Sequence, residues 1–261
     1  MPTIAELSAV YANFMLSPRP GPDVCRTCFN FTRGYEQCYG CMAAEPRLDL
    51  VVPISYSVSY EQLHHALWSY KRQAGAAAMH SGAAVAAILW RFLALHERCV
   101  VNALEISRFP LLTTVPSGSR ERDRQHALRR LVGEAVAVTR ERYERLLART
   151  EHEVPPHTFS AAKYAPLRAL QGEPVLLIDD TWTTGASAQS AAAALKAAGA
   201  GAVAAVVIGR HLNRSWHEND SRLARLSRPF DWQRCVLCAP SEEQAATYSL
   251  AASRAPPRTC L

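Results

Sequence analysis

The chain has 261 residues, of which 49% are apolar and 20% charged, a composition that is ordinary for a soluble globular protein and sufficient for a sizeable buried core. Its net charge of +6 suits an anionic ligand, either a phosphorylated metabolite or a nucleic acid, without choosing between them. No uninterrupted apolar run reaches the roughly 20 residues needed to cross a bilayer, and the N-terminal segment contains Glu6 and lacks the basic start of a signal peptide. We therefore expect a cytoplasmic protein with reduced thiols and no membrane partner.

Helix and strand patterns alternate along the chain. We expect, in order, a helix over roughly 3–16, a cysteine-rich module up to residue 45, a strand over 48–58, helices over 61–73 and 82–97, and a strand over 109–115. A long helix over 123–149, a loop over 150–165, a strand over 174–179, a helix ending near 198 and a strand over 202–208 follow. Continuous Val, Ile and Leu runs between helices predict an α/β fold whose parallel sheet is covered by helices on both faces.

This order predicts three parts. Residues 1–45 would form an N-terminal helix and a four-cysteine module, residues 46–230 the α/β domain, and residues 231–261 a C-terminal segment with a C-x2-C pair and a flexible tail.

The segment VLLIDDTWTTGAS, residues 175–187, points to a ligand site. A buried strand runs into Asp179 and Asp180, and a short loop with Gly185 leads into a helix. Ligands of parallel sheets bind where the strands end, and the N-terminus of a following helix favours phosphate. Because adjacent carboxylates repel each other, we expect a positive or hydroxylated group opposite them. The segment therefore predicts a ribose-5-phosphate site, with sugar hydroxyls or a magnesium ion near the carboxylates.

Other phosphate motifs do not fit this segment. A Walker A loop needs a lysine before its Ser or Thr, and a dinucleotide fingerprint needs G-x-G-x-x-G; both are absent here. The remaining alternative is an ordinary strand–turn–helix unit that carries two aspartates by chance.

With its acidic pair followed by T-T-G, the segment resembles the 5-phosphoribosyl 1-diphosphate (PRPP) signature of type I phosphoribosyltransferases. The resemblance implies a type I phosphoribosyltransferase-like sheet and the transfer of a ribosyl group from PRPP, bound with magnesium, to an acceptor such as a nucleobase or an amine. It implies that Asp179 and Asp180 hold the ribose hydroxyls as catalytic residues. The residues around the 5-phosphate would be Thr181, Trp182, Thr183, Thr184, Gly185, Ala186 and Ser187, with Trp182 packed beneath the loop.

Pyrophosphate would need a second loop after an earlier strand. The stretch TTVPSGSR, residues 113–120, fits this role, with Val115, Pro116 and Ser117 at the strand end and Arg120 as the cation. A simple surface turn is the alternative interpretation of the same residues.

The cysteines of the N-terminal module are spaced as C-x2-C-x9-C-x2-C, at Cys25, Cys28, Cys38 and Cys41. Each pair can hold one side of a tetrahedral zinc ion, and four thiolates leave no open position, so the spacing predicts a structural zinc site. Two disulfides are the alternative, which a reducing compartment disfavours. A third pair, Cys235 and Cys238, lacks a partner pair unless Cys99 or Cys260 contributes; buried or redox-sensitive thiols are equally compatible with it.

A four-cysteine module joined to a PRPP signature resembles the ComF-type family, which is linked to bacterial natural competence; the likeness covers roughly residues 25–215. The chain departs from that family after the first loop, where SRERDRQHAL (119–128) replaces an Arg-Gly-Phe-Asn-like stretch. The loop over 150–165 also lacks the expected glutamine and asparagine residues. Lys163 and Arg168 are the nearest cations that could close over pyrophosphate.

Three weaker patterns each allow two interpretations. The helix end SYKRQ (69–73) corresponds to a lysine-bearing helix end in the family, but we interpret it as solvated. The arginines at 120, 122, 124, 129 and 130 could meet pyrophosphate or a DNA backbone, although the interleaved Glu121 and Asp123 favour a salt-bridged surface. His211 could border the site, and the remaining histidines are interpreted as surface residues.

The sequence thus predicts a PRPP-dependent phosphoribosyltransferase with structural zinc and with magnesium bound alongside PRPP. The alternative is an accessory protein of the competence type that senses PRPP or handles DNA without turnover. The segment 175–187 predicts PRPP binding under both hypotheses.

Overall fold

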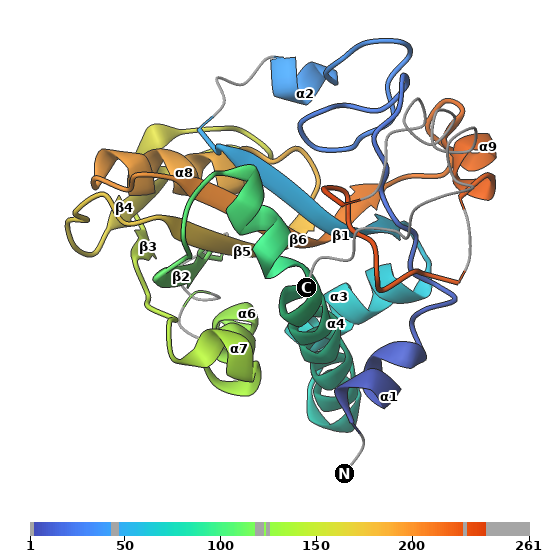
Figure 1. The fold of residues 1–261 in the computed structure, drawn as a ribbon, viewed down its shortest axis with the longest axis horizontal. Coiled ribbons are helices and arrows are strands. Elements are labelled where there is room, and N and C mark those ends of the chain that lie inside the picture. The colour runs from blue at the N-terminus through green and yellow to red at the C-terminus, as the bar shows by residue number, and fades with distance from the viewer. Residues whose placement is uncertain (1–2, 43–46, 118–122, 124–125, 227–228, 239–261) are drawn as a thin grey trace, which may run out of the picture.

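The computed structural model describes residues 3–42, 47–117, 123, 126–226 and 229–238 (Figure 1). Four strands form a fully parallel sheet in the order β1–β6–β5–β2. Their bounds are β1 (Leu50–Val58), β6 (Val203–Leu212), β5 (Val175–Trp182) and β2 (Leu111–Thr114). The sheet confirms the expected parallel α/β class, and its strands end at one common edge.

The two faces of the sheet carry separate apolar clusters, because alternate side chains of a strand point to opposite faces. On β5, Leu176 and Ile178 join the cluster that packs under α3 (Gln62–Arg72) and α4 (Gly75–Ala103). Val175 and Leu177 join the other cluster, which packs under α8 (Ala186–Ala197). Figure 1 shows these helices on opposite sides of the sheet. Both faces are therefore buried, as continuous apolar strands predict.

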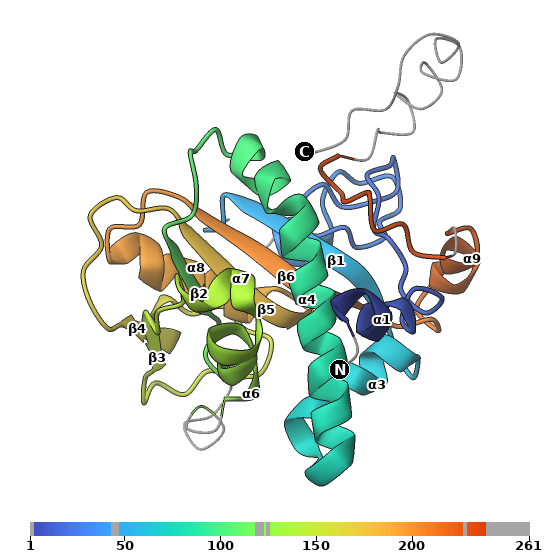
Figure 2. The same cartoon turned by 60° about the horizontal axis from the view of Figure 1, so that its bottom comes forward.

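The helix α4 is longer than the predicted segment 82–97 and lies across the sheet face beside α1 (Ile4–Ala9) and α3 (Figure 2). By length and composition alone it is apolar enough to cross a membrane, the single such helix among the described residues, and half of the qualifying window is buried inside the protein. Packing against β1 and β6 accounts for its apolar surface.

The predicted long helix over 123–149 is wrong. In its place lie α6 (Ala127–Arg130), a π-helical turn over Leu131–Ala135 and α7 (Ala137–Arg140), with an extended break at Val136. The hydroxyl of Thr139 donates to the carbonyl of Val132 at 2.5 Å, which joins α7 to the π-helical turn across the break. Side-chain hydrogen bonds of this kind compete with helix continuation.

The segment that follows α7 forms backbone hydrogen bonds with β2, the strand at the edge of the sheet. The N–H of Leu112 donates to Arg142 O at 3.0 Å, and Glu144 N donates to Leu112 O at 2.8 Å. An exposed strand edge needs hydrogen-bond partners, and this segment supplies them to β2. The apolar spacing that predicted a helix therefore belongs to residues that cover the core in another conformation.

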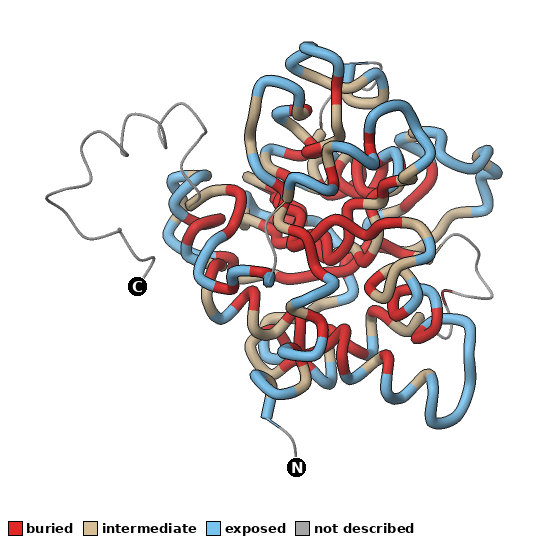
Figure 3. The backbone as a smooth tube through the Cα atoms, turned by 90° about the vertical axis from the view of Figure 1, so that its right-hand side faces the viewer, coloured by how far each residue is buried: buried red, intermediate tan, exposed pale blue. Residues whose placement is uncertain are grey.

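The predicted loop over 150–165 contains short regular structure. A 3₁₀ turn (Ala161–Lys163) leads into β4 (Tyr164–Pro166), which pairs antiparallel with β3 (Leu147–Arg149). The remaining helices are α2 (Tyr39–Met42), in the cysteine module, and α9 (Asn219–Ala224). Figure 3 shows the buried stretches of the chain concentrated at the centre of the molecule and the exposed stretches around them.

Candidate functional site

The acidic pair lies inside β5 rather than after it, because the strand continues to Trp182. Alternation along the strand sends Asp180 to the α3 side and Asp179 to the α8 side of the sheet. The two carboxylates, adjacent in sequence, therefore have different surroundings.

Asp180 is buried, with 5% of its surface exposed, and is met by two groups from the end of α3. The hydroxyl of Tyr70 donates to Asp180 Oδ2, and the ammonium of Lys71 forms an ion pair with the same oxygen. Burial, followed by the nearby Asp180 charge, raises the pKa of Tyr70 well above its usual range, so this hydroxyl keeps its proton. The positive and hydroxylated groups expected opposite the acidic pair are present, and they come from the protein itself.

Asp179 is partly buried and has no such ion pair among the described residues. The N–H of Asp180 donates to Asp179 Oδ1 at 3.0 Å. Burial, reinforced by the charge of Asp180, raises the pKa of Asp179 to about 7. Asp179 is thus the carboxylate of the pair that is available to a cation or to hydroxyl donors.

The loop between β5 and α8 is shaped by Gly185 and Trp182. Gly185 has φ +85°, and a Cβ at this position would lie 2.1 Å from a ring carbon of Trp182. Trp182 is 2% exposed and lies beneath the loop, as its sequence context predicts. Thr183 and Thr184 are exposed above it, and Thr181 is partly buried. Glycine is required here both for the left-handed conformation and for the close ring.

A buried lysine meets the beginning of α8, the helix that starts with Ala186. Lys163, 6% exposed, donates from Nζ to Ser187 Oγ at 2.8 Å. Burial, with a contribution from the Arg149 charge, lowers the pKa of Lys163. Among the described residues, none forms an ion pair with this ammonium. The first N–H groups of α8 point toward the same end, since a helix cannot satisfy them internally.

The predicted pyrophosphate loop follows β2, beside the end of β5. Val115 N donates to Ile178 O at 3.1 Å, which places Val115 next to Asp179 across the parallel pair. Tyr164 donates from its hydroxyl to Pro116 O at 3.2 Å, and Ser117 N donates to the buried carboxylate of Asp123 at 3.0 Å. Arg120 lies outside the described residues. The fold brings the two predicted ligand segments to adjacent strand ends.

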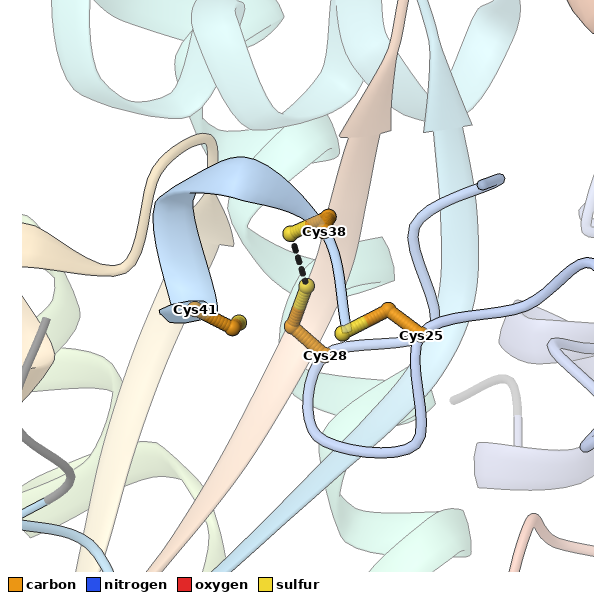
Figure 4. A group of neighbouring side chains, drawn as sticks. All are labelled: Cys25, Cys28, Cys38 and Cys41. Carbon is orange, nitrogen blue, oxygen red and sulfur yellow. Dashed lines mark hydrogen bonds between the residues drawn. The ribbon is translucent and has the colours of Figure 1, made fainter. Parts of the chain in front are cut away.

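The four cysteines of the N-terminal module converge in space (Figure 4). Their sulfur atoms all lie within 4.8 Å of one another, with Cys28 and Cys38 at 3.6 Å. No disulfide joins any of the seven cysteines that the structure describes. Four sulfurs in this arrangement could hold a metal ion such as zinc, and they would leave no position for a substrate.

Arg210, on β6, joins the cysteine module to the loop. This buried guanidinium donates to Cys28 O at 3.0 Å and to Trp182 O at 3.1 Å, and it approaches Cys28 Sγ at 3.7 Å. The module also lies close to the loop directly, because a Cβ on Gly40 would be 3.7 Å from Thr184 O.

Two other predicted residues differ in their relation to this centre. Arg168 is bound to Glu144 by two hydrogen bonds of 2.6 and 2.8 Å, so it does not close over the site. His211, at the end of β6, lines a pocket together with Thr183 and Thr184, so it borders the loop, and its ring lies 5.3 Å from that of His64 between centroids.

Of the arginine cluster, Arg129 lies near Asp123 at 3.9 Å, as expected of a salt-bridged surface. The arginines at 120, 122 and 124 fall outside the described residues.

The structure adds Tyr70, Lys71 and Arg210 to the predicted set. The stretch SYKRQ contained the signal for Lys71: its last three residues are exposed, as the solvated interpretation predicts, and the lysine also pairs with Asp180. No sequence pattern around Arg210 indicates its role, because an arginine inside an apolar strand can be interpreted only when its hydrogen-bond partners are known.

Comparison with known proteins assigns no family. No protein-family model matches the chain, and no curated protein matches it either. The functional assignment therefore depends on the residues described above.

Proposed function

We propose that the protein is a PRPP-dependent phosphoribosyltransferase, with the 5-phosphate held by residues 181–187. The reaction would break the bond between ribose C1 and the pyrophosphate oxygen, which keeps the electron pair. A lone pair of the acceptor nitrogen would form the new bond to C1, and this nitrogen would release its proton to solvent or to the departing pyrophosphate. Positive charge develops on the sugar during this exchange, so carboxylates and positioning carry the catalysis.

The observation that carries the proposal is the buried ammonium of Lys163 at the beginning of α8. A buried charge is costly unless an opposite charge pairs with it. Lys163 reaches Ser187 Oγ at 2.8 Å, and the N-terminus of α8 favours an anion at the same place. Thr183, Thr184 and Ser187 add hydroxyl donors. Asp179 acts on this ammonium without forming an ion pair with it, and a phosphate bound there would pair with it directly, which supports a phosphorylated ligand.

The carboxylate of Asp179 would accept hydrogen bonds from the ribose hydroxyls and would help to hold magnesium. Oxygen ligands of this type suit a hard divalent cation. Magnesium, when bound, would neutralise charge on the pyrophosphate. The loop of Val115, Pro116 and Ser117 at the neighbouring strand end would receive that pyrophosphate, with Arg120 as its predicted cation.

A second function, PRPP sensing without turnover, is favoured by the surroundings of Asp180. Its carboxylate is occupied by Lys71 and Tyr70, so a single carboxylate remains for the ligand. One carboxylate can support binding, whereas the family resemblance implies that catalysis uses both.

Calorimetric titration of the full chain with PRPP and magnesium tests the binding half of the proposal. We expect the wild type to bind, and Lys163→Met to weaken binding at least about tenfold, or ~1.4 kcal/mol, because it removes the ammonium. Lys196→Met is the matched control, since Lys196 lies at the other end of α8 and pairs with Asp49 at 2.7 Å. Absence of PRPP binding by the folded wild type would refute both functions.

A pyrophosphate-release screen against nucleobases and amines then separates the two functions. Release that depends on a particular acceptor supports the transferase. Tight PRPP binding without release for any acceptor supports the sensing function.

A further inference from the structure

A second group of metal-ligating side chains lies on the other face of the sheet from the N-terminal cysteines. His96 and Cys99 come from α4, and Cys235 and Cys238 come from the C-terminal segment. One ring nitrogen and three sulfurs all lie within 4.8 Å of one another. Cys99 and Cys235 belong to the apolar cluster under α4, whereas Cys25 and Cys28 belong to the cluster on the opposite face. The two groups are therefore separate.

The distances within this group are within about 0.4 Å of those of a tetrahedral zinc site. With zinc about 2.3 Å from sulfur and about 2.0–2.1 Å from nitrogen, two sulfur ligands lie roughly 3.8 Å apart, and a sulfur and the nitrogen roughly 3.5 Å apart. The sulfurs of Cys235 and Cys238 are 3.4 Å apart, and His96 Nδ1 is 3.8 Å from the sulfurs of both Cys99 and Cys238.

The orientation of His96 gives independent support. Its Nε2 lies 2.9 Å from the carbonyl of Trp232, which can only accept, so Nε2 carries the hydrogen. Nδ1 then has a free lone pair, and it is this atom that faces the sulfurs. Metal-bound histidines are held in this way, with the second ring nitrogen donating to a carbonyl or a carboxylate.

Burial is also consistent with a closed site. His96 is 2% exposed, Cys99 5% and Cys235 7%, so the prediction that such histidines lie at the surface is wrong for His96. Buried cysteines alone could be simple apolar residues, and two nearby thiols could be a redox pair. A thiol that donates to Nδ1 would account for one of these contacts, whereas the convergence of one nitrogen and three sulfurs within 4.8 Å of one another is what a four-ligand metal site requires.

We propose that His96, Cys99, Cys235 and Cys238 bind a second, structural zinc ion. The ion fastens the segment 229–238 to α4. Two nearby contacts also hold this segment. The guanidinium of Arg91, on α4, lies 4.4 Å from the ring centroid of Trp232, and Phe230 N donates to Ala12 O, in the N-terminal segment, at 2.7 Å. The spacings H-x2-C at 96–99 and C-x2-C at 235–238 are the sequence counterpart of this site. The inference does not depend on the proposed transferase function.

The test is the number of zinc ions per chain, measured by elemental analysis and by native mass spectrometry on the full chain purified without added zinc. We expect two in the wild type and one in the double variant Cys235→Ser/Cys238→Ser. His96→Ala should also lose one, while His96→Cys should retain two, because cysteine can replace the nitrogen ligand. His80→Ala, at an exposed position of the same helix, and Cys260→Ser are the controls and should retain two.

If the variants do not fold, measurements on the wild type alone still test the proposal. Cobalt substitution should then give two tetrahedral sites, one with four sulfur ligands and one with three. A single zinc per wild-type chain overturns the proposal, and a chain mass lower by two hydrogens, located by peptide mapping at Cys235 and Cys238, would identify a disulfide in its place. Loss of zinc from Cys260→Ser would equally overturn the assignment of ligands.

Discussion

At the scale of single residues, the adjacent aspartates behave as two different groups. Asp180 is paired with Lys71 and Tyr70, and Asp179 has a pKa raised to about 7 by burial and by the charge of Asp180. From the sequence, which shows only two like charges side by side, replacing both with asparagine is expected to leave stability unchanged or slightly higher. The structure predicts opposite effects for the two positions.

Asp179→Asn should stabilise the ligand-free protein at pH 8, by on the order of 1–2 kcal/mol. The raised pKa means that the folded state keeps a proton that the unfolded state releases near the ordinary value of 3.8, so stability of the wild type falls as pH rises from about 4 to about 7. Asp180, Lys71 and Lys163 are the charged groups that act on this carboxylate. Urea denaturation at pH 4, 6 and 8, without magnesium and at constant zinc concentration, measures the effect, which should grow with pH.

Asp180→Asn is the matched comparison and should destabilise the protein, because it leaves the ammonium of Lys71 without its partner. A gain of stability in both variants would mean that like-charge repulsion dominates at both positions.

At the scale of elements, the connection between β5 and α8 depends on one glycine. Gly185 combines a left-handed backbone with a position directly against the ring of Trp182. By contrast, the predicted helix over 123–149 failed although its apolar spacing was regular, because the edge of β2 and the hydroxyl of Thr139 offered the chain other hydrogen bonds. Periodicity identified residues that face the core, and backbone hydrogen bonding decided their conformation.

Gly185→Ala should lower the free energy of unfolding by about 2–4 kcal/mol, since the new methyl group both strains the backbone and collides with Trp182. Gly82→Ala is the control, because it lies inside α4 with no atom within 4 Å of an added Cβ. That variant should be neutral or stabilising by up to about 1 kcal/mol. Chemical denaturation of both proteins measures the difference, and equal effects would contradict the close packing at the loop.

At the scale of the whole molecule, distant parts of the chain meet at the two cysteine groups. Arg210 of β6 ties Cys28 to Trp182, so the N-terminal module is fastened to the loop that follows β5. The second group joins α4 to the C-terminal segment on the other face of the sheet. The helical layers and the sheet are therefore held at both sides by side chains far apart in sequence.

Arg210→Met should destabilise the protein by about 2–4 kcal/mol, because two buried carbonyls lose a charged donor while the apolar stem is kept. Arg26→Met is the control: its ion pair with Glu36, at 2.8 Å, joins side chains that are 68% and 78% exposed. Surface pairs of this kind contribute about 0–1 kcal/mol. Thermal and urea denaturation at constant zinc concentration measure both variants, and a similar small effect would show that the module is not held through Arg210.

Patterns of neighbouring residues were enough to predict the local features of this protein. Apolar runs fixed the strands and the parallel class, the C-x2-C spacing identified the N-terminal cysteine group, and the segment 175–187 marked the strand–loop–helix unit with its glycine. These features depend on neighbours a few residues apart, whose geometry the backbone dictates. No local pattern shows which carboxylate is paired; the packing of α3 against the sheet decided this, because Lys71 lies more than a hundred residues from Asp180 in the chain. Tertiary packing also brings His96 and Cys99 to Cys235 and Cys238, since such contacts depend on how helices pack across the sheet rather than on any local pattern.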